Sequence, residues 1–184
     1  MKRCREVEMA KIYGLELKNI KHFAGDEGEC YQGNLYIGSK KIASWSQDSH
    51  GALEDRLSMA KGYSEAKLRS ALEKKRPKAE KGIALECMMS ELVQYLGYEK
   101  IFKKAVKKGY SSIYLLDDGF KISYWMLNAP TKKEAIKQIG KDTVEAQKEK
   151  MLKNCKIEEV FFSSEDQFDL YSDKQIKQKD IKEV

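Results

Sequence analysis

Several features that define large classes of proteins are scarce or missing in this sequence. It contains only two prolines and no segment rich in glycine and serine, so we expect no long linker. No apolar run approaches the ~20 residues that a helix needs to cross a bilayer. The first residues, MKRCREVEMAKIYG, are basic but lack the apolar stretch of a secretory signal peptide. The sequence therefore predicts a cytoplasmic protein with no membrane contact.

Closely spaced metal ligands and nucleotide-binding motifs are also missing. The four cysteines are far apart and form no CxxC motif: Cys4, Cys30, Cys87 and Cys155. His22 and His50 could join them in a zinc site only through long-range contacts. The glycines form neither GxGxxG nor GxxxxGK[ST]. No nucleophile lies beside His50, so we expect no catalytic residue, no metal and no cofactor.

Charge is abundant but unevenly distributed. Residues 61–108 hold thirteen Lys/Arg and six Asp/Glu, within a chain whose net charge is +6. Clustered basic residues are typical of surfaces that bind phosphates, although a solvated helix face has the same composition. The sequence predicts nucleic-acid contacts from eight residues of this region: Lys74, Lys75, Arg76, Lys78, Lys103, Lys104, Lys107 and Lys108.

Acidic residues gather near the end of the sequence. Residues 157–173 hold six acids and no base. A one-signed stretch of this kind is suited to a basic protein surface. We also expect the polar loop after residue 46 to be the rim of a binding surface. The predicted protein-binding residues are Asp48, His50, Glu158, Glu159, Glu165, Asp166 and Asp169.

Residue patterns predict an α+β fold with antiparallel strands. Alternation with a period of two predicts a three-stranded meander, at residues 12–17, 31–37 and 42–46. Apolar residues at helical spacing predict three helices, at residues 64–75, 83–96 and 98–107. We expect a turn-rich loop at residues 21–29. Gly97 is expected to end the second helix and Gly109 the third.

The later part of the chain predicts a hairpin, a helix and a strand. Asp118-Gly119 is a strong turn signal between two β-rich runs. Thr131 and Glu134 form a capping box, which predicts a helix from Thr131 to about Lys153. Residues 156–162 are typical of a last strand.

The strands and helices are expected to form one α+β domain with two lobes. The sequence predicts a β-rich lobe at residues 10–57 and a mixed helical and β lobe at residues 62–172. We expect the tail, residues 174–184, to be frayed because termini order only when they are packed.

Part of the chain resembles a module of small phage and mobile-element proteins of Firmicutes. The resemblance covers roughly residues 15–57 and is carried by these residues: Lys18-Asn19-Ile20-Lys21, Phe23, Gly25, Glu27, Gly28, Asn34-Leu35-Tyr36, Lys40-Lys41-Ile42, Asp48 and Gly51. Related sequences often have a glycine pair at the last position, whereas Gly51 is followed here by Ala52. In length and in its lack of enzyme motifs the chain also looks like the type II anti-CRISPR proteins, which inhibit Cas9.

The resemblance implies a non-enzymatic inhibitor that binds a defence effector of the bacterial host. Cas9 with its guide RNA would be the partner, and DNA binding or cleavage would be blocked. Two alternatives stay open. One is a small metal-dependent nuclease, with carboxylates drawn from Asp26, Glu27, Glu29, Asp48, Glu54 and Asp55. The other is a phage accessory protein that binds DNA. Independently of these alternatives, Tyr31, Tyr36 and Trp45 could serve as a base-stacking platform.

Overall fold

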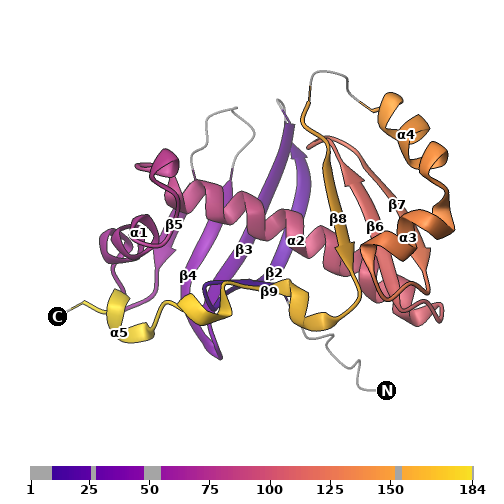
Figure 1. The fold of residues 1–184 in the computed structure, drawn as a ribbon. Coiled ribbons are helices and arrows are strands. Elements are labelled where there is room, and N and C mark those ends of the chain that lie inside the picture. The colour runs from indigo at the N-terminus through magenta and orange to yellow at the C-terminus, as the bar shows by residue number, and fades with distance from the viewer. Residues whose placement is uncertain (1–9, 26–27, 48–54, 152–154, 184) are drawn as a thin grey trace, which may run out of the picture. The chain divides into compact units, whose positions relative to one another are not determined.

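The computed structural model describes residues 10–25, 28–47, 55–151 and 155–183, with the backbone alone for residues 23–25, 28–29 and 79. Its fold is α+β, as predicted: helices accompany a six-stranded mixed sheet and a three-stranded antiparallel sheet (Figure 1). Contacts between residues divide the chain into two compact units. Unit 1 comprises residues 1–96 and 168–184, and unit 2 comprises residues 97–167.

The six-stranded sheet belongs to unit 1 and has the order β5-β4-β3-β2-β1-β9. Its strands are β1 (Lys11–Ile12), β2 (Leu15–Gly25), β3 (Gly28–Ile37), β4 (Lys40–Gln47), β5 (Asp55–Met59) and β9 (Asp169–Leu170). β1 and β9 run parallel, and the other neighbours are antiparallel. The predicted meander forms β2, β3 and β4, but its first strand was wrongly predicted as continuous: a turn at Tyr13-Gly14, both with positive φ, divides it into β1 and β2. β5 and β9 were not predicted.

One face of this sheet is apolar because every second side chain points to it. Leu17 pairs with Leu35 and Leu35 with Ala43, and all three are fully buried. The first half of helix α2 (Ala84–Lys107) crosses this face (Figure 1). It contributes four further core residues: Leu85, Met88, Met89 and Leu92. Each such side chain stabilises the unit by roughly 1.5–3 kcal/mol.

The predicted loop at residues 21–29 was wrong. β2 continues to Gly25 and β3 begins at Gly28, with Lys21 opposite Gln32. The polar and glycine-rich composition indicates a loop, but antiparallel pairing satisfies the backbone hydrogen bonds of both segments.

The predicted end of a helix at Gly97 was also wrong. After α1 (Glu65–Glu73) and the short helix η1 (Lys78–Glu80), α2 runs through Gly97 for 24 residues. An interior glycine costs roughly 1 kcal/mol, which burial of Leu96 and Tyr98 on either side outweighs. Gly109, with φ +87°, follows the end of the helix as predicted.

Unit 2 is built on the three-stranded sheet, with the order β7-β6-β8. Its strands are β6 (Ser112–Asp117), β7 (Ile122–Leu127) and β8 (Glu158–Phe162). The predicted Asp-Gly hairpin joins β6 and β7, and Gly119 has φ +86°. Every residue of β6 is buried, since both faces of this strand are covered. At the end of β6, the carboxylate of Asp117 accepts a hydrogen bond of 2.6 Å from the hydroxyl of Tyr98 in α2.

The helix predicted from Thr131 to Lys153 is two helices. α3 (Lys132–Ile139) begins as expected, because the Thr131 hydroxyl accepts a hydrogen bond from the backbone N–H of Glu134 at 3.3 Å. Gly140, with φ +92°, then ends α3 and starts α4 (Lys141–Glu149). An L-residue rarely adopts this φ, so glycine permits the sharp bend. Side chains of α3 and α4 cover Tyr114 and Leu116 of β6.

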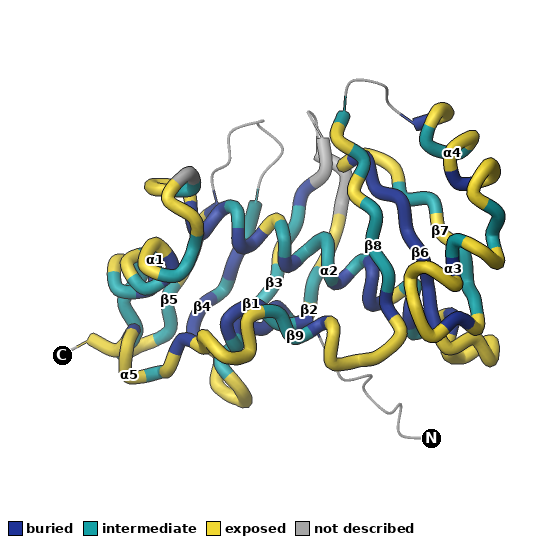
Figure 2. Tube along the Cα trace, in the orientation of Figure 1, coloured by how far each residue is buried: buried dark blue, intermediate teal, exposed yellow. Residues whose placement is uncertain are grey.

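The tail is packed and not frayed. The short helices η2 (Glu165–Phe168) and η3 (Ser172–Lys174) are followed by α5 (Gln178–Ile181), which contacts α1. Ile176 and Ile181 are buried, as the dark segments of the tail in Figure 2 show. The units also begin and end at other residues than the predicted lobes, residues 10–57 and 62–172, since α1, the first half of α2 and the tail all belong to unit 1.

Candidate functional site

The second face of the six-stranded sheet is polar and is called the open face here. Its side chains form two rows that run across β2, β3, β4 and β5 through directly paired residues. The first row is Lys18, Asn34, Ser44 and Ser58, and the second is Lys21, Gln32, Ser46 and Arg56. Each row spans roughly 14 Å, because neighbouring strands lie about 4.8 Å apart. Both rows begin with a lysine and consist of hydrogen-bonding side chains.

A β-bulge in β2 brings the two lysines to the same face. The register shifts between Lys18 and Lys21, where Asn19 has φ +56°. Residues three apart in a regular strand point to opposite faces, so one extra residue is needed to align them. Asparagine tolerates this left-handed conformation better than most residues. The bulge therefore builds the cationic side of the open face.

The rows surround a hollow with a volume of about 470 Å³. Eleven residues line it: Asn19, Lys21, Gln32, Gly33, Asn34, Ser44, Trp45, Ser46, Arg56, Leu57 and Ser58. Lys21, Gln32, Arg56 and Ser58 are exposed. Within the described part of the chain, the hollow is thus open to a partner.

The charge of the open face is positive. Among the described residues its acids are Glu16, next to Tyr36, and Asp169 of β9, which pairs with Lys11. Glu16 forms ion pairs with Lys11 at 3.2 Å and Lys18 at 2.6 Å. The Lys18 ammonium also lies 5.0 Å from the centre of the Tyr36 ring. Arg56, Lys21 and the exposed Lys41, which pairs with Tyr36, add further positive charge. Such a face attracts anions.

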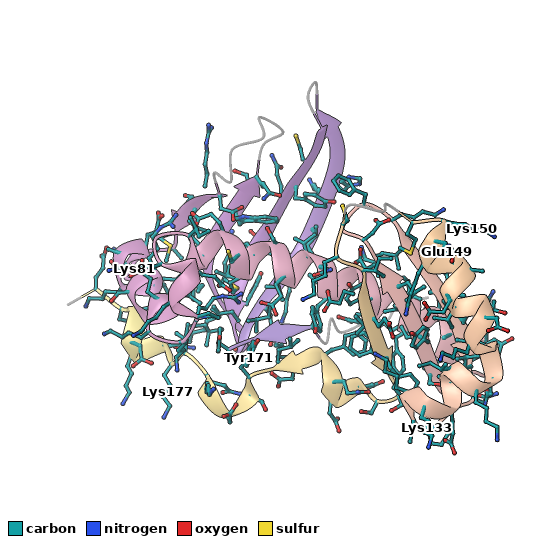
Figure 3. The ribbon with its side chains drawn as sticks, turned by 45° about the horizontal axis from the view of Figure 1, so that its top comes forward. Lys81, Lys133, Glu149, Lys150, Tyr171 and Lys177 are labelled. Atoms are coloured by element: carbon teal, nitrogen blue, oxygen red, sulfur yellow. The ribbon has the colours of Figure 1, made fainter. Side chains whose placement is uncertain are left out.

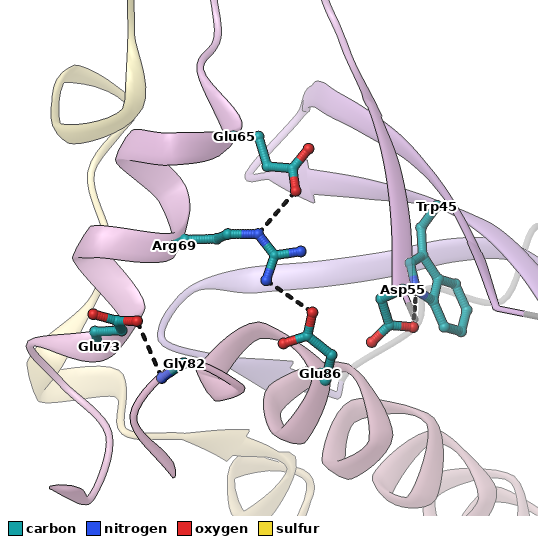
Figure 4. A network of polar contacts seen from close by, with 7 residues as sticks. All are labelled: Trp45, Asp55, Glu65, Arg69, Glu73, Gly82 and Glu86. Atoms are coloured by element: carbon teal, nitrogen blue, oxygen red, sulfur yellow. Dashed lines mark hydrogen bonds and ion pairs between the residues drawn. The ribbon is translucent and has the colours of Figure 1, made fainter. Parts of the chain in front are cut away.

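A buried polar network lies beneath this face and fixes strand β5 (Figure 4). The indole N–H of Trp45 donates to Asp55 at 2.7 Å. The guanidinium of Arg69 in α1 donates hydrogen bonds to the carboxylates of Glu65 and Glu86, each at 2.8 Å. Burial raises the pKa of Asp55 to about 6; the nearby Glu86 adds to the rise, while the Trp45 hydrogen bond opposes it. The Trp45 bond ties β5, which carries Arg56, to β4, and the Arg69–Glu86 bond ties α1 to α2.

The side chains of the open face can form hydrogen bonds and ion pairs with a ligand. Amide and hydroxyl side chains can donate and accept hydrogen bonds, and lysine and arginine can contact phosphate. Among the described residues, no group of three or more His, Cys, Asp or Glu side chains is arranged to hold a metal ion. Of the carboxylates considered for a nuclease, only the side chain of Asp55 is described, and it is buried against Trp45.

The structure places the predicted basic residues in two groups. Lys74 and Lys78 are exposed beside a hollow of about 230 Å³ in unit 1, and Lys75 is half-buried. Arg76 is not available to a phosphate. Its side chain is only 8% exposed and forms ion pairs with Glu80 and Glu91.

The second basic group lies in unit 2, at the end of α2. Lys104, Lys107 and Lys108 are exposed. Lys103 forms an ion pair of 2.5 Å with Glu99, which holds it along the helix.

The acidic residues predicted to bind protein have different surroundings. Glu158, Glu165 and Asp166 are exposed, whereas Asp169 is half-buried in β9. Glu159 is engaged within unit 2. It accepts a hydrogen bond from Tyr114 and forms ion pairs with Lys148 and Lys132. The predicted Asp48 and His50 lie outside the described residues.

The Glu159 cluster is a structural element of unit 2. The carboxylate lies 2.5 Å from Lys148, 2.7 Å from the Tyr114 hydroxyl and 3.4 Å from Lys132. The Lys148 hydrogen bond, followed by that of Tyr114, lowers the pKa of Glu159 to about 2. Glu159 is therefore ionised and already compensated inside the unit.

The aromatic platform considered from the sequence is divided between the two faces of the sheet. Trp45 is buried on the apolar face and stacks on Tyr31, with ring centres 6.5 Å apart. Tyr36 lies in the Glu16 row of the open face. Sequence reasoning missed Lys21, Gln32, Ser46, Arg56 and Ser58. The alternation of polar residues in β3, β4 and β5 was the signal that could have found the last four, whereas the position of Lys21 depends on the bulge in β2.

Comparison with known proteins identifies no relative of this chain. No protein-family model, no curated protein and no solved structure matches this chain. No described helix has the length and apolarity to cross a membrane.

Proposed function

We propose that this protein is a non-enzymatic binding protein whose open face contacts the nucleic acid of its partner. The observation that supports this function is the pair of polar rows, which place Lys21 and Arg56 at opposite ends of one hollow. Cations bind phosphate oxygens, while amides and hydroxyls between them bind sugars and base edges. Tyr36 offers a ring on which a base can stack beside Lys18.

The lysines at the end of α2 are proposed as a separate contact. Lys104, Lys107 and Lys108 are exposed in unit 2, whereas the open face belongs to unit 1. Each contact is therefore testable by its own variants.

The partner that we propose is a defence ribonucleoprotein of a bacterial host, with Cas9 and its guide RNA as the specific candidate. Support for this choice is the resemblance of residues 15–57 to phage and mobile-element proteins, together with a surface suited to an RNA backbone. The protein would then block DNA binding or cleavage by occupying the nucleic-acid channel.

Binding of a labelled 20-nucleotide RNA, measured by fluorescence anisotropy at several salt concentrations, tests the open face. The Lys21→Ala/Arg56→Ala variant should bind at least tenfold more weakly than the wild type. Each lost phosphate contact should also reduce, by about 0.7, the steepness with which the logarithm of the binding constant falls with the logarithm of the salt concentration. The Lys104→Glu/Lys107→Glu/Lys108→Glu variant should weaken binding independently of the first pair.

A control with the same change of charge as the open-face pair is Lys61→Ala/Lys179→Ala, two exposed lysines elsewhere in unit 1. This control should keep the wild-type affinity and salt slope. Equal losses in the control and the open-face variant would contradict a local site. DNA of the same length, compared in parallel, distinguishes an RNA partner from DNA binding by an accessory protein.

Stoichiometry separates a binding protein from an enzyme. Inhibition of a Cas9–guide RNA complex should saturate at a fixed molar ratio, and labelled RNA incubated with the protein and Mg²⁺ should stay intact. Cleavage of the RNA by substoichiometric protein, with loss of that cleavage in EDTA, would support the nuclease alternative instead.

A further inference from the structure

Unit 2 has a hollow of its own, beside the bend between α3 and α4. Its volume is about 640 Å³, and it is lined by Thr131, Lys133, Glu134, Ile136, Lys137 and Lys141. Volumes of this size are typical of small-molecule sites. The hollow does not involve the open face, which belongs to unit 1.

Three positive charges face this hollow. Lys133, Lys137 and Lys141 are exposed and lie four residues apart. Lys133 and Lys137 are neighbours on α3, where like charges destabilise each other, and Lys141 follows the bend as the first residue of α4. The lining acid, Glu134, is hydrogen-bonded to the Thr131 hydroxyl at 3.2 Å.

Other lysines of the same helices are compensated. Lys132 and Lys148 both form ion pairs with Glu159, at 3.4 and 2.5 Å. Within the described ranges, by contrast, Lys133, Lys137 and Lys141 form no ion pair of 4.0 Å or less. The acids of unit 2 thus neutralise lysines beside the hollow and leave those that line it uncompensated.

The bend that carries these lysines is held in place. Gly140, with φ +92°, joins α3 directly to α4. Ile136 and Ile139 pack against the core formed with Tyr114 and Leu116. In Figure 3, Lys133 projects from α3 and Lys150 lies at the far end of α4. The three lysines are therefore presented by a fixed support.

We propose that this hollow binds a ligand with two or more neighbouring phosphate groups. Lysine ammonium groups bind phosphate as point charges, and a ligand with several phosphates can engage more than one of them. The half-buried Ile136 offers a further, apolar contact. Free polyphosphates and nucleic-acid backbones share this chemistry. The proposal does not rest on the function assigned to the open face.

Two ligands test the site and distinguish these sources: inorganic tripolyphosphate by isothermal titration calorimetry, and the labelled RNA by anisotropy. Lys133→Ala/Lys137→Ala/Lys141→Ala should reduce affinity for at least one ligand by tenfold or more. Alanine favours helices, so this variant should stay folded. Its matched control is Lys121→Ala/Lys150→Ala/Lys156→Ala, which removes the same charge from exposed positions of unit 2.

The control should change the affinity less than threefold. Loss of tripolyphosphate binding in the site variant assigns the hollow to free polyphosphates, and loss of RNA binding alone assigns it to a nucleic-acid backbone. The proposal is overturned if the wild type binds neither ligand, or if site variant and control lose affinity equally. The Lys21→Ala/Arg56→Ala variant, measured alongside, shows separately whether the open face contributes.

Discussion

The indole N–H of Trp45 donates a 2.7 Å hydrogen bond to one carboxylate oxygen of Asp55, and both side chains are buried. The other oxygen of Asp55 is buried without a hydrogen-bond partner in the structure, as is one oxygen of Glu86. Glu86 contributes to raising the pKa of Asp55, and Figure 4 shows the two side chains close to each other. A proton on Asp55 relieves the cost of burying its charge.

Asp55→Asn should therefore stabilise unit 1 above pH 6 and remove part of its pH dependence. The folded-state pKa of about 6 exceeds the ordinary value of 3.8, so the favourable contribution is complete below pH 4 and is lost as pH rises through 6. The difference between these two pKa values corresponds to a change of at most about 3 kcal/mol in the free energy of unfolding. The asparagine keeps an oxygen that can accept the Trp45 hydrogen bond.

Urea denaturation at pH 4 to 8, followed by Trp45 fluorescence in a Trp125→Phe background, measures this effect. The chain has two tryptophans, one in each unit, so this background reports on unit 1 alone. Asp173→Asn, at an exposed position of unit 1, is the matched control. A variant whose stability falls as steeply as that of the wild type from pH 4 to 6 would disprove the role of Asp55.

Glu159→Gln should destabilise unit 2 at pH 7 by about 1–2 kcal/mol, since Lys148, Lys132 and Tyr114 lose a charged partner near the surface. The pKa of Glu159 is lowered from 4.5 to about 2, so its contribution is complete above pH 4.5 and is lost as pH falls through 2. The two proteins should thus become equally stable in acid.

Trp125 fluorescence in a Trp45→Phe background follows unit 2 in this experiment. Glu158→Gln changes the exposed neighbouring acid and should leave the stability unchanged. If Glu159→Gln instead slowed association with a basic partner without loss of stability, Glu159 would be a contact residue, as the sequence predicted.

Arg76→Gln should destabilise unit 1 by about 2–3 kcal/mol and leave the RNA affinity of the folded protein unchanged. The arginine is 8% exposed, and its removal leaves Glu80 and Glu91 partly buried without their cation. Lys74→Gln, at an exposed position, is the control for stability. If folded Arg76→Gln protein bound RNA more weakly than the wild type, Arg76 would be a phosphate-binding residue, as the sequence predicted.

Ile181→Ala should destabilise unit 1 by about 2–4 kcal/mol, because this side chain is fully buried in the tail. The same substitution at Ile83, which is 41% exposed, should cost less than about 1 kcal/mol. Chemical denaturation at pH 7 compares the two. Similar small effects for both would mean that the tail is not part of the unit 1 core.

The elements that local patterns define were predictable from the sequence. The Thr131 cap, the Asp-Gly hairpin and the meander each depend on neighbouring residues or on a period of two. Helix α2 was not predicted as one helix, because a glycine weakens a helix locally while buried residues on both sides keep it intact. The packed tail escaped prediction for the same reason, since Ile176 and Ile181 are buried by segments distant in sequence.

The open face was unpredictable in its most important detail. Lys18 and Lys21 are three residues apart, and regular alternation places them on opposite faces. The bulge at Asn19 depends on how β2 pairs with β3, which no local pattern encodes. Trp45 and Tyr36 were both considered for base stacking, and the register of their strands decides which of them faces the solvent.

The interruption of unit 1 by unit 2 has a consequence for synthesis on the ribosome. Residues 1–96 emerge before unit 2, but β9 and α5 emerge after it. Until then, the nascent chain lacks the strand that pairs with β1 and the helix that contacts α1. Closing this long interval carries an entropic cost, so unit 1 completes its core only after the inserted unit has left the ribosome. A stalled nascent chain would expose apolar surface that the finished protein hides.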